Sequence, residues 1–454
     1  MKFPRMAPVH YIPLSFLVVI TIGTLLLMLP VSCTSGHGAD LLTALFTSTT
    51  SVCVTGLVVV DTYAYWSLFG QIVILILIQI GGFGVVAVLS MIMIATGKKL
   101  FLSNRVLLGD SLNLDREHEV LNFLIRMFKD VMIVELCGAI ICSFELIPLL
   151  GVKKGIWASV FHSVSAFCNA GMDVIGADSL LGLRSAGMFM WTTMALIVLG
   201  GIGFIVWFDM IDGIKHGIRH RFSPRQIFTH LPEHTRVVIL MTLFLILAGA
   251  ACIFIFEYDN PYTLGVMSIK DKILNSLFQS VTFRTAGFAS IPQENLKESS
   301  CIIGYVLMFI GGSPIGTAGG IKTMTAFLFF INALSYINGK KENVVFHKKV
   351  PEEQLKKSAA IVFFSLLTVF VMNLLLISIC GFAHTDALYE VISALGTVGL
   401  SRGLTPHLNS AGRIIIIISM YLGRIGPISM AVFFAKEKRS DNTLVHAKGH
   451  FYVG

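Results

Sequence analysis

Thr50–Leu57, TSVCVTGL, is an uncharged stretch of small and hydroxyl-bearing residues that lies between two long apolar runs. The short run that leads into it, Ala39–Ser51, would form a helix about 20 Å long. A bilayer contains about 30 Å of hydrocarbon, so a helix of this length cannot cross it. We therefore expect the segment to enter a membrane and to return as irregular backbone.

The composition places the chain in a membrane. Of its 454 residues, 55% are hydrophobic and 13% are charged, whereas a soluble globule has about 25% charged residues. The net charge of +8 comes from basic residues that cluster in loops beside apolar runs. This clustering is typical of membrane topology and argues against nucleic acid as a partner. The first apolar run lacks a small-residue cleavage site, and we expect it to be retained as a membrane helix.

Eight apolar runs reach the 18 or so residues that a helix needs to cross a bilayer. They are Tyr11–Val31, Gln71–Ile94, Val131–Leu150, Met188–Phe208, Val237–Phe256, the interrupted run Ile302–Leu334, Ala359–Cys380 and Ile414–Phe434.

The opening stretch has three counterparts farther along the chain. The four segments are LFTSTTSVCVTGL at 45–57, VFHSVSAFCNAGM at 160–172, LFQSVTFRTAGF at 277–288 and LYEVISALGTVGL at 388–400. Their matched glycines, 112 to 116 residues apart, are Gly56, Gly171, Gly287 and Gly399. A second motif keeps the same period and begins at Ile80 (IGGFG), Leu199 (LGGIG), Ile310 (IGGSP) and Leu422 (LGRIG). Two markers with one period predict an all-α polytopic membrane protein: four pseudo-symmetric helix–pore loop–helix repeats around one central pore, with eight transmembrane helices.

The repeats are predicted at residues 1–96, 129–214, 237–338 and 357–436, and cytoplasmic segments at 97–128, 215–236, 339–356 and 437–454. An acidic residue stands near the start of three of the short helices, where it favours the positive end of the helix dipole. These residues are Asp40, Asp271 and Asp386, whereas the second repeat has Lys154 there. The negative ends of the dipoles would then point inward, which favours a cation.

Each pore loop supplies three residues to a predicted selectivity filter. Its glycine accepts backbone angles that other residues avoid, so successive carbonyls can face one axis. Rings of carbonyl oxygens replace the hydration shell of a potassium ion without formal charge. We predict potassium at the filter carbonyls of Val54, Thr55, Gly56, Asn169, Ala170, Gly171, Thr285, Ala286, Gly287, Thr397, Val398 and Gly399.

These features resemble the superfamily of Trk, Ktr and plant HKT potassium transport proteins. The resemblance covers almost the whole chain and rests on the fourfold repeat, one filter glycine per copy, TAGGIK after Ser313 and Pro314, and LGRIGP in the last helix. In that superfamily a serine in place of the first filter glycine accompanies sodium selectivity, so Gly56 implies potassium. Cys53 stands where the family pattern has a hydroxyl residue.

Within the superfamily, the Ktr type fits best. Trk subunits usually carry two further helices ahead of the fourfold core, whereas only about ten residues precede Tyr11. The resemblance implies a homodimer of pore subunits and a cytosolic nucleotide-binding, RCK-type regulatory ring similar to KtrA.

An interruption distinguishes the third repeat. Residues 304–334 as one helix would be about 46 Å long, but GGSPIGTAGG at 311–320 breaks the helical pattern. We expect a non-helical loop that lines the cavity under the filter, and the resemblance gives this loop the role of a gate. In GGFG and GGIG we expect the glycines to allow close helix packing. The predicted gating residues are Gly311, Gly312, Ser313, Pro314, Gly316, Thr317, Ala318, Gly319, Gly320, Lys322 and Arg424.

Charged residues at membrane depth are expensive and are treated as functional. We hypothesise that Arg424 donates hydrogen bonds to loop carbonyls and helps to keep the loop across the ion path. Arg284 would repel cations if it faced the pore. We therefore expect its side chain to pair with a partner behind the filter, such as Glu390. Glu135 and Asp173 are acids at membrane depth or near a filter, and both a coupling role and a structural role stay open for them.

The distribution of basic residues predicts the orientation. The termini and the loops between repeats hold 23 of the 34 lysines and arginines, and the opposite side holds 9. The more basic side of a membrane protein is cytoplasmic, which places both termini in the cytoplasm, at a bacterial plasma membrane. The basic loops fit a protein partner and anionic membrane lipid equally well.

The predicted function is potassium transport across the plasma membrane as the translocating subunit of a Ktr-type uptake system, with sodium dependence left open. The alternative is a Trk- or HKT-like potassium/sodium symporter. A membrane enzyme is not predicted, because the sequence has no carboxylate cluster for a metal or a diphosphate. Other secondary transporters commonly have twofold inverted repeats, unlike the four copies here.

Overall fold

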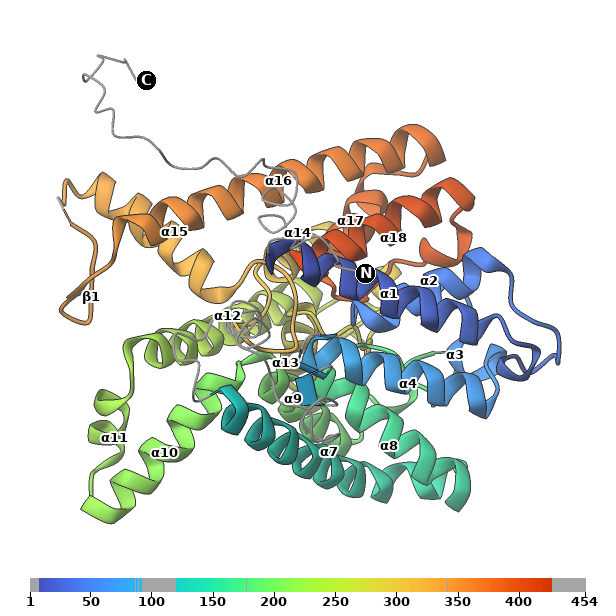
Figure 1. Cartoon of the computed structure of the whole chain (residues 1–454), viewed down its shortest axis with the longest axis horizontal. Coiled ribbons are helices and arrows are strands. Elements are labelled where there is room, and N and C mark those ends of the chain that lie inside the picture. Colours follow the sequence, from blue (N-terminus) through green and yellow to red (C-terminus); the bar gives the residue numbers. More distant parts are fainter. Residues whose placement is uncertain are drawn as a thin grey trace, which may run out of the picture.

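The computed structural model describes residues 8–85, 87–88, 90–91, 120–176, 178–340 and 342–426. This part of the chain is mostly helical (Figure 1), and its two strands, β1 (Val344–Val345) and β2 (Lys348–Lys349), form one antiparallel hairpin. Most of the predicted segment 97–128, all of 437–454 and the ends of the predicted spans Gln71–Ile94 and Ile414–Phe434 lie outside the described residues.

Twelve of the described helices follow one another as four groups of three. The groups are α1 (Pro8–Leu27), α2 (Leu41–Val52) and α4 (Leu68–Phe83); α7 (Val120–Leu150), α8 (Val152–Cys168) and α9 (Gly187–Gly201); α12 (Glu233–Glu257), α13 (Ile269–Phe283) and α14 (Glu298–Phe309); and α16 (Glu352–Cys380), α17 (His384–Gly396) and α18 (Ser410–Ile425). The connecting helices are α3 (Thr62–Tyr65), α10 (Phe204–His220), α11 (Pro224–His230) and α15 (Thr323–Ile337), and the short 3-10 turns are η1 (Pro30–Ser32), η2 (Leu181–Leu183), η3 (Gln293–Asn295) and η4 (Thr405–His407).

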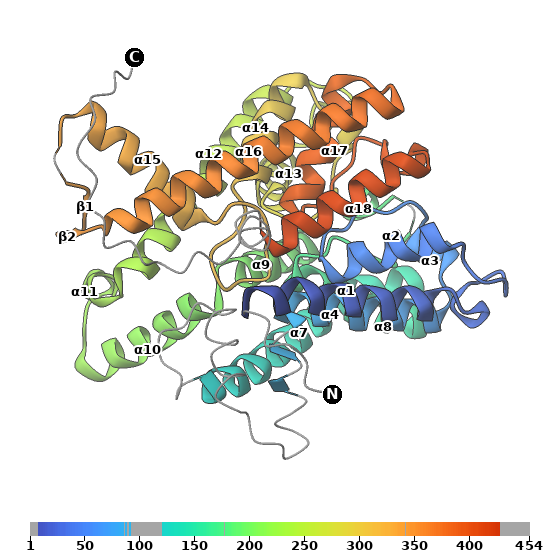
Figure 2. The same ribbon diagram turned by 45° about the horizontal axis from the view of Figure 1, so that its top comes forward.

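The groups pack in a closed ring. Within each group the three helices contact one another, and the last helix of each group also contacts the short middle helix of the next. These contacts join α4 to α8, α9 to α13, α14 to α17 and α18 to α2. The last contact brings the end of the chain against its beginning, so red α18 lies beside blue α1 and α2 in Figures 1 and 2.

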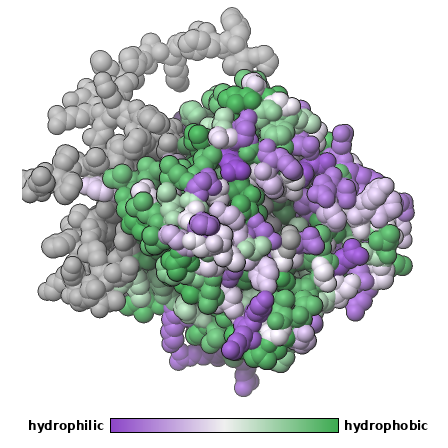
Figure 3. All heavy atoms as spheres, turned by 90° about the vertical axis from the view of Figure 1, so that its right-hand side faces the viewer, coloured by the Kyte–Doolittle hydropathy of each residue, from purple (hydrophilic) through white to green (hydrophobic). Residues whose placement is uncertain are grey.

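Three described helices are long and apolar enough to cross a bilayer: residues 122–150 of α7, α12 and α16. A fourth candidate consists of α9 and α10 together, although these two helices are bent by 102° at the break between them. Helices α4 and α14, and residues 11–27 of α1, are apolar but shorter. Many large hydrophobic side chains face outward, among them Leu136, Phe244 and Phe363. Figure 3 shows one face of the molecule, where hydrophilic residues occupy much of the centre and right and hydrophobic areas border them.

The last glycine of the second motif caps a helix in three of the groups: Gly84 and Gly426 follow the last residues of α4 and α18, and Gly203 precedes the first residue of α10. Gly84, Gly203 and Gly426 have φ angles of 86°, 95° and 90°, which side chains of L-residues disfavour. The run Met188–Phe208, expected as one membrane span, is divided at Gly203 into α9 and α10, which pass as a candidate span only together. The packing role expected for GGFG and GGIG is confirmed at Gly81 and Gly200, where an added Cβ would overlap a carbonyl oxygen at the end of α2 or α8.

The acidic residues expected near the starts of three short helices lie there, but only Asp40 is a helix cap. Asp40 caps α2 by accepting a hydrogen bond from the amide of Thr43 at 3.0 Å. In α13 the cap is Ser268, whose hydroxyl accepts from the amide of Asp271. Asp386 lies in the first turn of α17 and pairs with Arg402 at 2.8 Å. The acidic residues thus stay near the positive ends of three dipoles, although only one of them is the cap.

Candidate functional site: four glycine segments and an intramembrane loop

The four segments that follow the short helices meet in the interior of the ring. A Cβ built on Gly171 would lie 2.7 Å from the carbonyl oxygen of Ala286, and one on Gly287 would lie 2.5 Å from that of Val398. At Gly56 and Gly399 an added Cβ would overlap the carbonyl oxygens of Ala170 and Thr55, respectively. Each glycine thus lies against the segment of the next group, in the same cyclic order as the helices. The chain approaches so closely at these four positions that no side chain fits.

The residue two positions before each glycine also has a positive φ angle. The angles are 54° at Val54, 59° at Asn169, 68° at Thr285 and 50° at Thr397. Such a conformation costs about 1 to 2 kcal/mol for a residue with a Cβ, and it is unusual for the β-branched residues among them. Its recurrence at four matched positions indicates a backbone conformation that the surrounding packing imposes, as is typical of functional sites.

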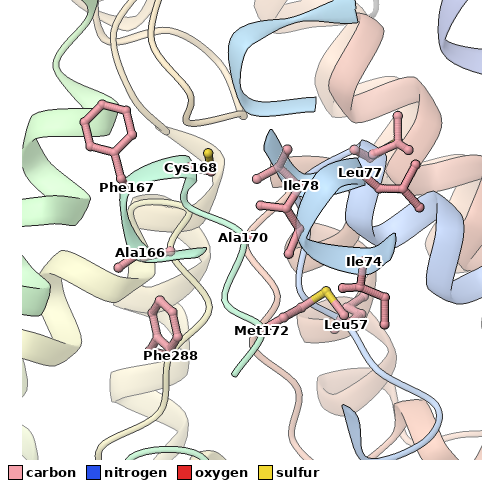
Figure 4. Close-up of a cluster of buried hydrophobic side chains, with 14 of the residues drawn as sticks. Leu57, Ile74, Leu77, Ile78, Ala166, Phe167, Cys168, Ala170, Met172 and Phe288 are labelled. Carbon is pink, nitrogen blue, oxygen red and sulfur yellow. The ribbon is translucent and has the colours of Figure 1, made fainter. Parts of the chain in front are cut away.

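Apolar side chains enclose the second segment. Ala170 and Met172 are fully buried, and the chain at these residues passes between α4, with Leu77 and Ile78, and the ring of Phe288 (Figure 4). Because protein interiors are close-packed, such surroundings hold the backbone in one arrangement.

A hydroxyl group near the end of each short helix holds the segment that follows. The Thr50 hydroxyl accepts from the amide of Gly56 at 2.9 Å, and the Ser393 hydroxyl accepts from that of Gly399 at 3.1 Å. Ser165 accepts from Met172, one residue later, at 3.1 Å. In the third segment, which is one residue shorter, Thr282 donates to the carbonyl of Phe288 at 2.7 Å. Sequence analysis did not assign these four residues a role, although a hydroxyl five or six residues before each glycine is a visible signal.

The non-helical loop predicted at residues 311–320 is present between α14 and α15. Residues 311–320 are non-helical, and a bridge between Ile310 and Ile321 closes the base of the loop. The amide of Gly311 donates to the carbonyl of Ile321 at 3.0 Å, and the amide of Thr323 donates to that of Gly312 at 3.0 Å. The loop is therefore a defined turn with its own hydrogen bonds.

The loop is fastened to the break between α9 and α10. The amide of Ser313 donates to Gly201 at 2.8 Å, the amide of Thr317 donates to Gly200 at 3.0 Å, and the amide of Phe204 donates to the carbonyl of Ile315 at 3.0 Å. Backbone groups that a continuous helix would pair internally thus pair with the loop. The helix break at Gly203 provides the surface on which the loop of the third group rests.

Arg424 joins the loop to the first and last groups. Its guanidinium donates to the carbonyl of Thr317 at 2.6 Å and to the carbonyl of Gly81 at 2.5 Å. The hypothesis that Arg424 binds loop carbonyls is confirmed for Thr317. Lys322 donates to the carbonyl of Ala318 at 2.7 Å, so both predicted cations contact the loop backbone.

The expected pairing of Arg284 with Glu390 is wrong. Arg284 donates to the loop carbonyl of Gly311 at 3.1 Å, while Glu390 accepts hydrogen bonds from Ser401 and Thr405. A carbonyl oxygen has no sequence signature, which explains why a carboxylate was the more visible candidate.

The loop also touches two of the segments that contain the matched glycines. A Cβ added to Gly311 would lie 3.0 Å from Cγ2 of Thr285, and one added to Gly319 would overlap the hydroxyl of Thr397. The buried hydroxyls of Thr55, Thr285 and Thr397 have no hydrogen-bond partner within the described part of the chain. These three hydroxyls, one or two residues before a matched glycine, thus keep their full hydrogen-bonding capacity.

The structure shows the hydrogen bonds of Glu135 and Asp173, the two acidic residues whose role the sequence leaves undecided. Glu135 of α7 is buried and accepts from the amide group of Gln79 at 3.1 and 3.0 Å. Asp173, two residues after Gly171, accepts from the amide of Ile175 at 3.2 Å. These contacts are compatible with both the structural and the coupling interpretation.

Comparisons with known proteins identify the family. The sequence model of the family TrkH, cation transport protein, matches residues 4–445. The chain belongs to the TrkH family of cation transport proteins. It is 37% identical over 454 residues to the Ktr system potassium uptake protein B of Bacillus subtilis, covering all of this chain and 98% of that one.

Two further comparisons extend this result. The chain is 36% identical to the potassium/sodium uptake protein NtpJ of Enterococcus hirae, covering 99% of this chain and 98% of that protein. Its fold is similar to the crystal structure of the potassium transporter TrkH from Vibrio parahaemolyticus, with a TM-score of 0.73 and 17% identity over 96% of this chain and 86% of that one. Family membership and apolar helices together make the chain a multi-pass membrane protein of a transporter family.

Proposed function

We propose that this TrkH-family chain transports potassium ions as the translocating subunit of a Ktr-type uptake system. The observation that carries the proposal is the ring of four glycines, Gly56, Gly171, Gly287 and Gly399, each against the backbone of the next segment. Carbonyl rings of this kind suit potassium because dipoles replace its hydration shell without trapping it. The similarity to a potassium uptake protein B over the full length of the chain supports the same ion.

In this proposal the four helix groups are pseudo-symmetric repeats around one pore, with eight membrane passages. The closed ring of contacts and the matched positive φ angles support fourfold pseudo-symmetry. The filter comprises Val54–Gly56, Asn169–Gly171, Thr285–Gly287 and Thr397–Gly399. The unpaired hydroxyls of its three threonines support contact with water or ions.

The loop over Gly311–Gly320 is proposed as the gate, held closed by Lys322, Arg424 and the break at Gly203. Its hydrogen bonds to Gly200, Gly201 and Arg424 support this role, because each must break or shift before the loop can move. A loop stabilised by a small number of such bonds is suited to two alternative positions.

The partners and the orientation follow from the family and the charge pattern. We place both termini in the bacterial cytoplasm and expect a homodimer with a cytosolic nucleotide-binding ring. The name of the similar potassium uptake protein B, which belongs to a multi-subunit system, supports a second subunit. Similarity to a potassium/sodium uptake protein supports sodium as a second ion, and a potassium/sodium symporter is the alternative.

Flux measurements in liposomes test the proposal. Purified protein should carry potassium faster than sodium, and Gly56→Ser should lower this preference, since an added Cβ would overlap the Ala170 carbonyl. Gly187→Ser is the matched control, because a Cβ there meets open space. Equal potassium and sodium flux through the unaltered protein, or an unchanged preference in Gly56→Ser, would contradict the proposed filter.

A further inference from the structure

Two cavities of opposite character adjoin behind the intramembrane loop. One, of about 300 Å³, lies between the loop residues Gly319–Lys322, helix α16 and the end of α18. The other, of about 350 Å³, lies between α14, α15 and α16. They share the lining residues Phe309, Ile321, Val369 and Ile392. A single bound molecule that contacts both cavities would therefore need a polar part and an apolar part.

The first cavity is positively charged. Its described lining includes Lys322, Lys357 and Arg424 and contains no aspartate or glutamate. Arg424 and Lys322 each use part of their donor capacity on loop carbonyls, which leaves further N–H groups of Lys322 available. Lys357, near the start of α16, is exposed and has no ion-pair partner among the described residues. Three cations without a counter-charge favour a bound anion.

The hydroxyls on this wall of α16 are already satisfied. Ser365 donates to the carbonyl of Ile361 at 2.8 Å, and Thr368 donates to that of Phe364 at 2.7 Å. The side-chain donors left available to a ligand in this cavity are thus its cations and the hydroxyl of Thr325 on α15.

The second cavity is lined by apolar side chains from four helices. Its members include Val306, Ala326, Phe330, Val362 and Leu366. The hydroxyl of Tyr305 is the one polar side-chain group on the described lining, and it donates to the carbonyl of Thr385 at 3.1 Å. No donor or acceptor side chain on this wall is left to hold a polar ligand. A hydrocarbon chain fits such a lining, since burial of its surface is favourable and costs no hydrogen bond.

We propose that the two cavities bind one anionic diacyl phospholipid, with its phosphate at Lys322 and Lys357 and part of an acyl chain in the apolar cavity. A soluble phosphate would satisfy only the cationic cavity, and a neutral lipid would leave its three cations unpaired. The lipid would come from the leaflet at the amino-terminal end of α16, where the exposed Lys357 would meet anionic headgroups.

This site gives the lipid direct contact with the loop. A phosphate at Lys322 would add a charge-assisted contact to the residue that follows Gly320 and so stabilise the observed loop position. This consequence rests on the proposed function of the loop as a gate. The lipid site itself stands on the cavities and their charges alone.

Lipid retention by the full chain tests the site. Native mass spectrometry should show phosphatidylglycerol retained in preference to phosphatidylcholine, and Lys357→Ala should lower that retention about fivefold. Lys356→Ala is the matched control, because Lys356 is the adjacent exposed lysine, pairs with Glu352 at 2.8 Å and does not line the cavity. Ala326→Leu should lower retention by filling the apolar cavity, and inorganic phosphate should not displace the lipid.

The outcomes separate this site from the proposed transport. Equal retention of both lipids, or equal loss in Lys356→Ala and Lys357→Ala, would overturn the lipid site even if potassium flux is intact. Displacement by inorganic phosphate would show a free-anion site and would also overturn the proposal. Selective retention without potassium flux would support the lipid site and contradict the proposed function. If the lipid site and the proposed function are both correct, potassium flux should be lower in phosphatidylglycerol liposomes than in phosphatidylcholine liposomes. Lys357→Ala should remove this difference.

Discussion

Arg424 of α18 donates a hydrogen bond to the carbonyl of Thr317 at 2.6 Å, which ties the last helix of the ring to the loop of the third group. The same guanidinium also binds the Gly81 carbonyl in the first group, and the loop rests on Gly200 and Gly201 in the second. The loop and Arg424 together therefore connect all four groups. A change in the position of one group would therefore alter the hydrogen bonds that hold the loop.

Removal of the Arg424 side chain should release the loop. Arg424→Ala deletes two hydrogen bonds to carbonyls, and bonds made by a charged donor are each worth about 1.5 to 3 kcal/mol. We expect potassium flux in liposomes to rise about tenfold or more, with partial restoration in Arg424→Lys, which keeps the charge but not the two-pronged geometry.

Arg413→Ala provides the control for this change. Arg413 lies on the same helix but donates to Leu408 and to the hydroxyl of Thr43, away from the loop. Flux that is unchanged in Arg424→Ala under both high and low activity, or that rises equally in Arg413→Ala, would refute the gating role.

A disulfide across the loop should lock it. A Cβ built on Gly201 lies 3.4 Å from the Cβ of Ala318, close to the 3.5 to 4.5 Å typical of a disulfide. The double variant Gly201→Cys with Ala318→Cys should lose most of its potassium flux on oxidation and regain it with a reductant. Each single variant is the control for the eight native cysteines. Flux in the oxidised double variant equal to that of the single variants would show that conduction does not need the loop to move.

The period of the filter glycines could be predicted from the sequence, and the backbone around them could not. Glycine is required wherever another segment of the chain approaches closely, so the repeat is visible as a glycine at each matched position. The left-handed residues Val54, Asn169, Thr285 and Thr397 belong to three types, because packing rather than intrinsic preference imposes their angles. Nothing in their identity marks them.

The loop shows a similar division between what is visible in the sequence and what is not. Its glycines and Pro314 predict a break in the helix, and the break is present. The surface that receives the loop was missed, because GGIG is typical both of close packing and of a helix end, and in the structure it serves both purposes. The partners of Arg284 and Lys322 are carbonyl oxygens, which every residue carries, so their positions depend on the three-dimensional path of the chain.

A methyl group added at Gly399 should disrupt the proposed filter ring. Gly399→Ala would place a Cβ against the carbonyl of Thr55 at a residue with a φ angle of 95°. We expect potassium flux to fall at least about tenfold, since a distorted carbonyl ring no longer replaces the hydration shell. Gly176→Ala, close behind the second filter segment but surrounded by open space, should transport normally. Similar losses in both variants would indicate a general defect in assembly and would argue against a specific ring at Gly399.

The hydroxyl of Thr50 should set the position of the first filter segment. Thr50→Val keeps the shape of the side chain but leaves the amide of Gly56 without its acceptor at 2.9 Å, and an unsatisfied buried donor costs about 1 to 3 kcal/mol. Thr49 offers a matched control, because its neighbouring buried hydroxyl has no partner within the described residues, so Thr49→Val should be neutral. We expect Thr50→Val to lower the ratio of potassium to sodium flux and the unfolding temperature, and Thr50→Ser to restore both. A selectivity ratio that stays the same in Thr50→Val while the unfolding temperature falls would mean that the hydroxyl stabilises the fold without positioning the filter.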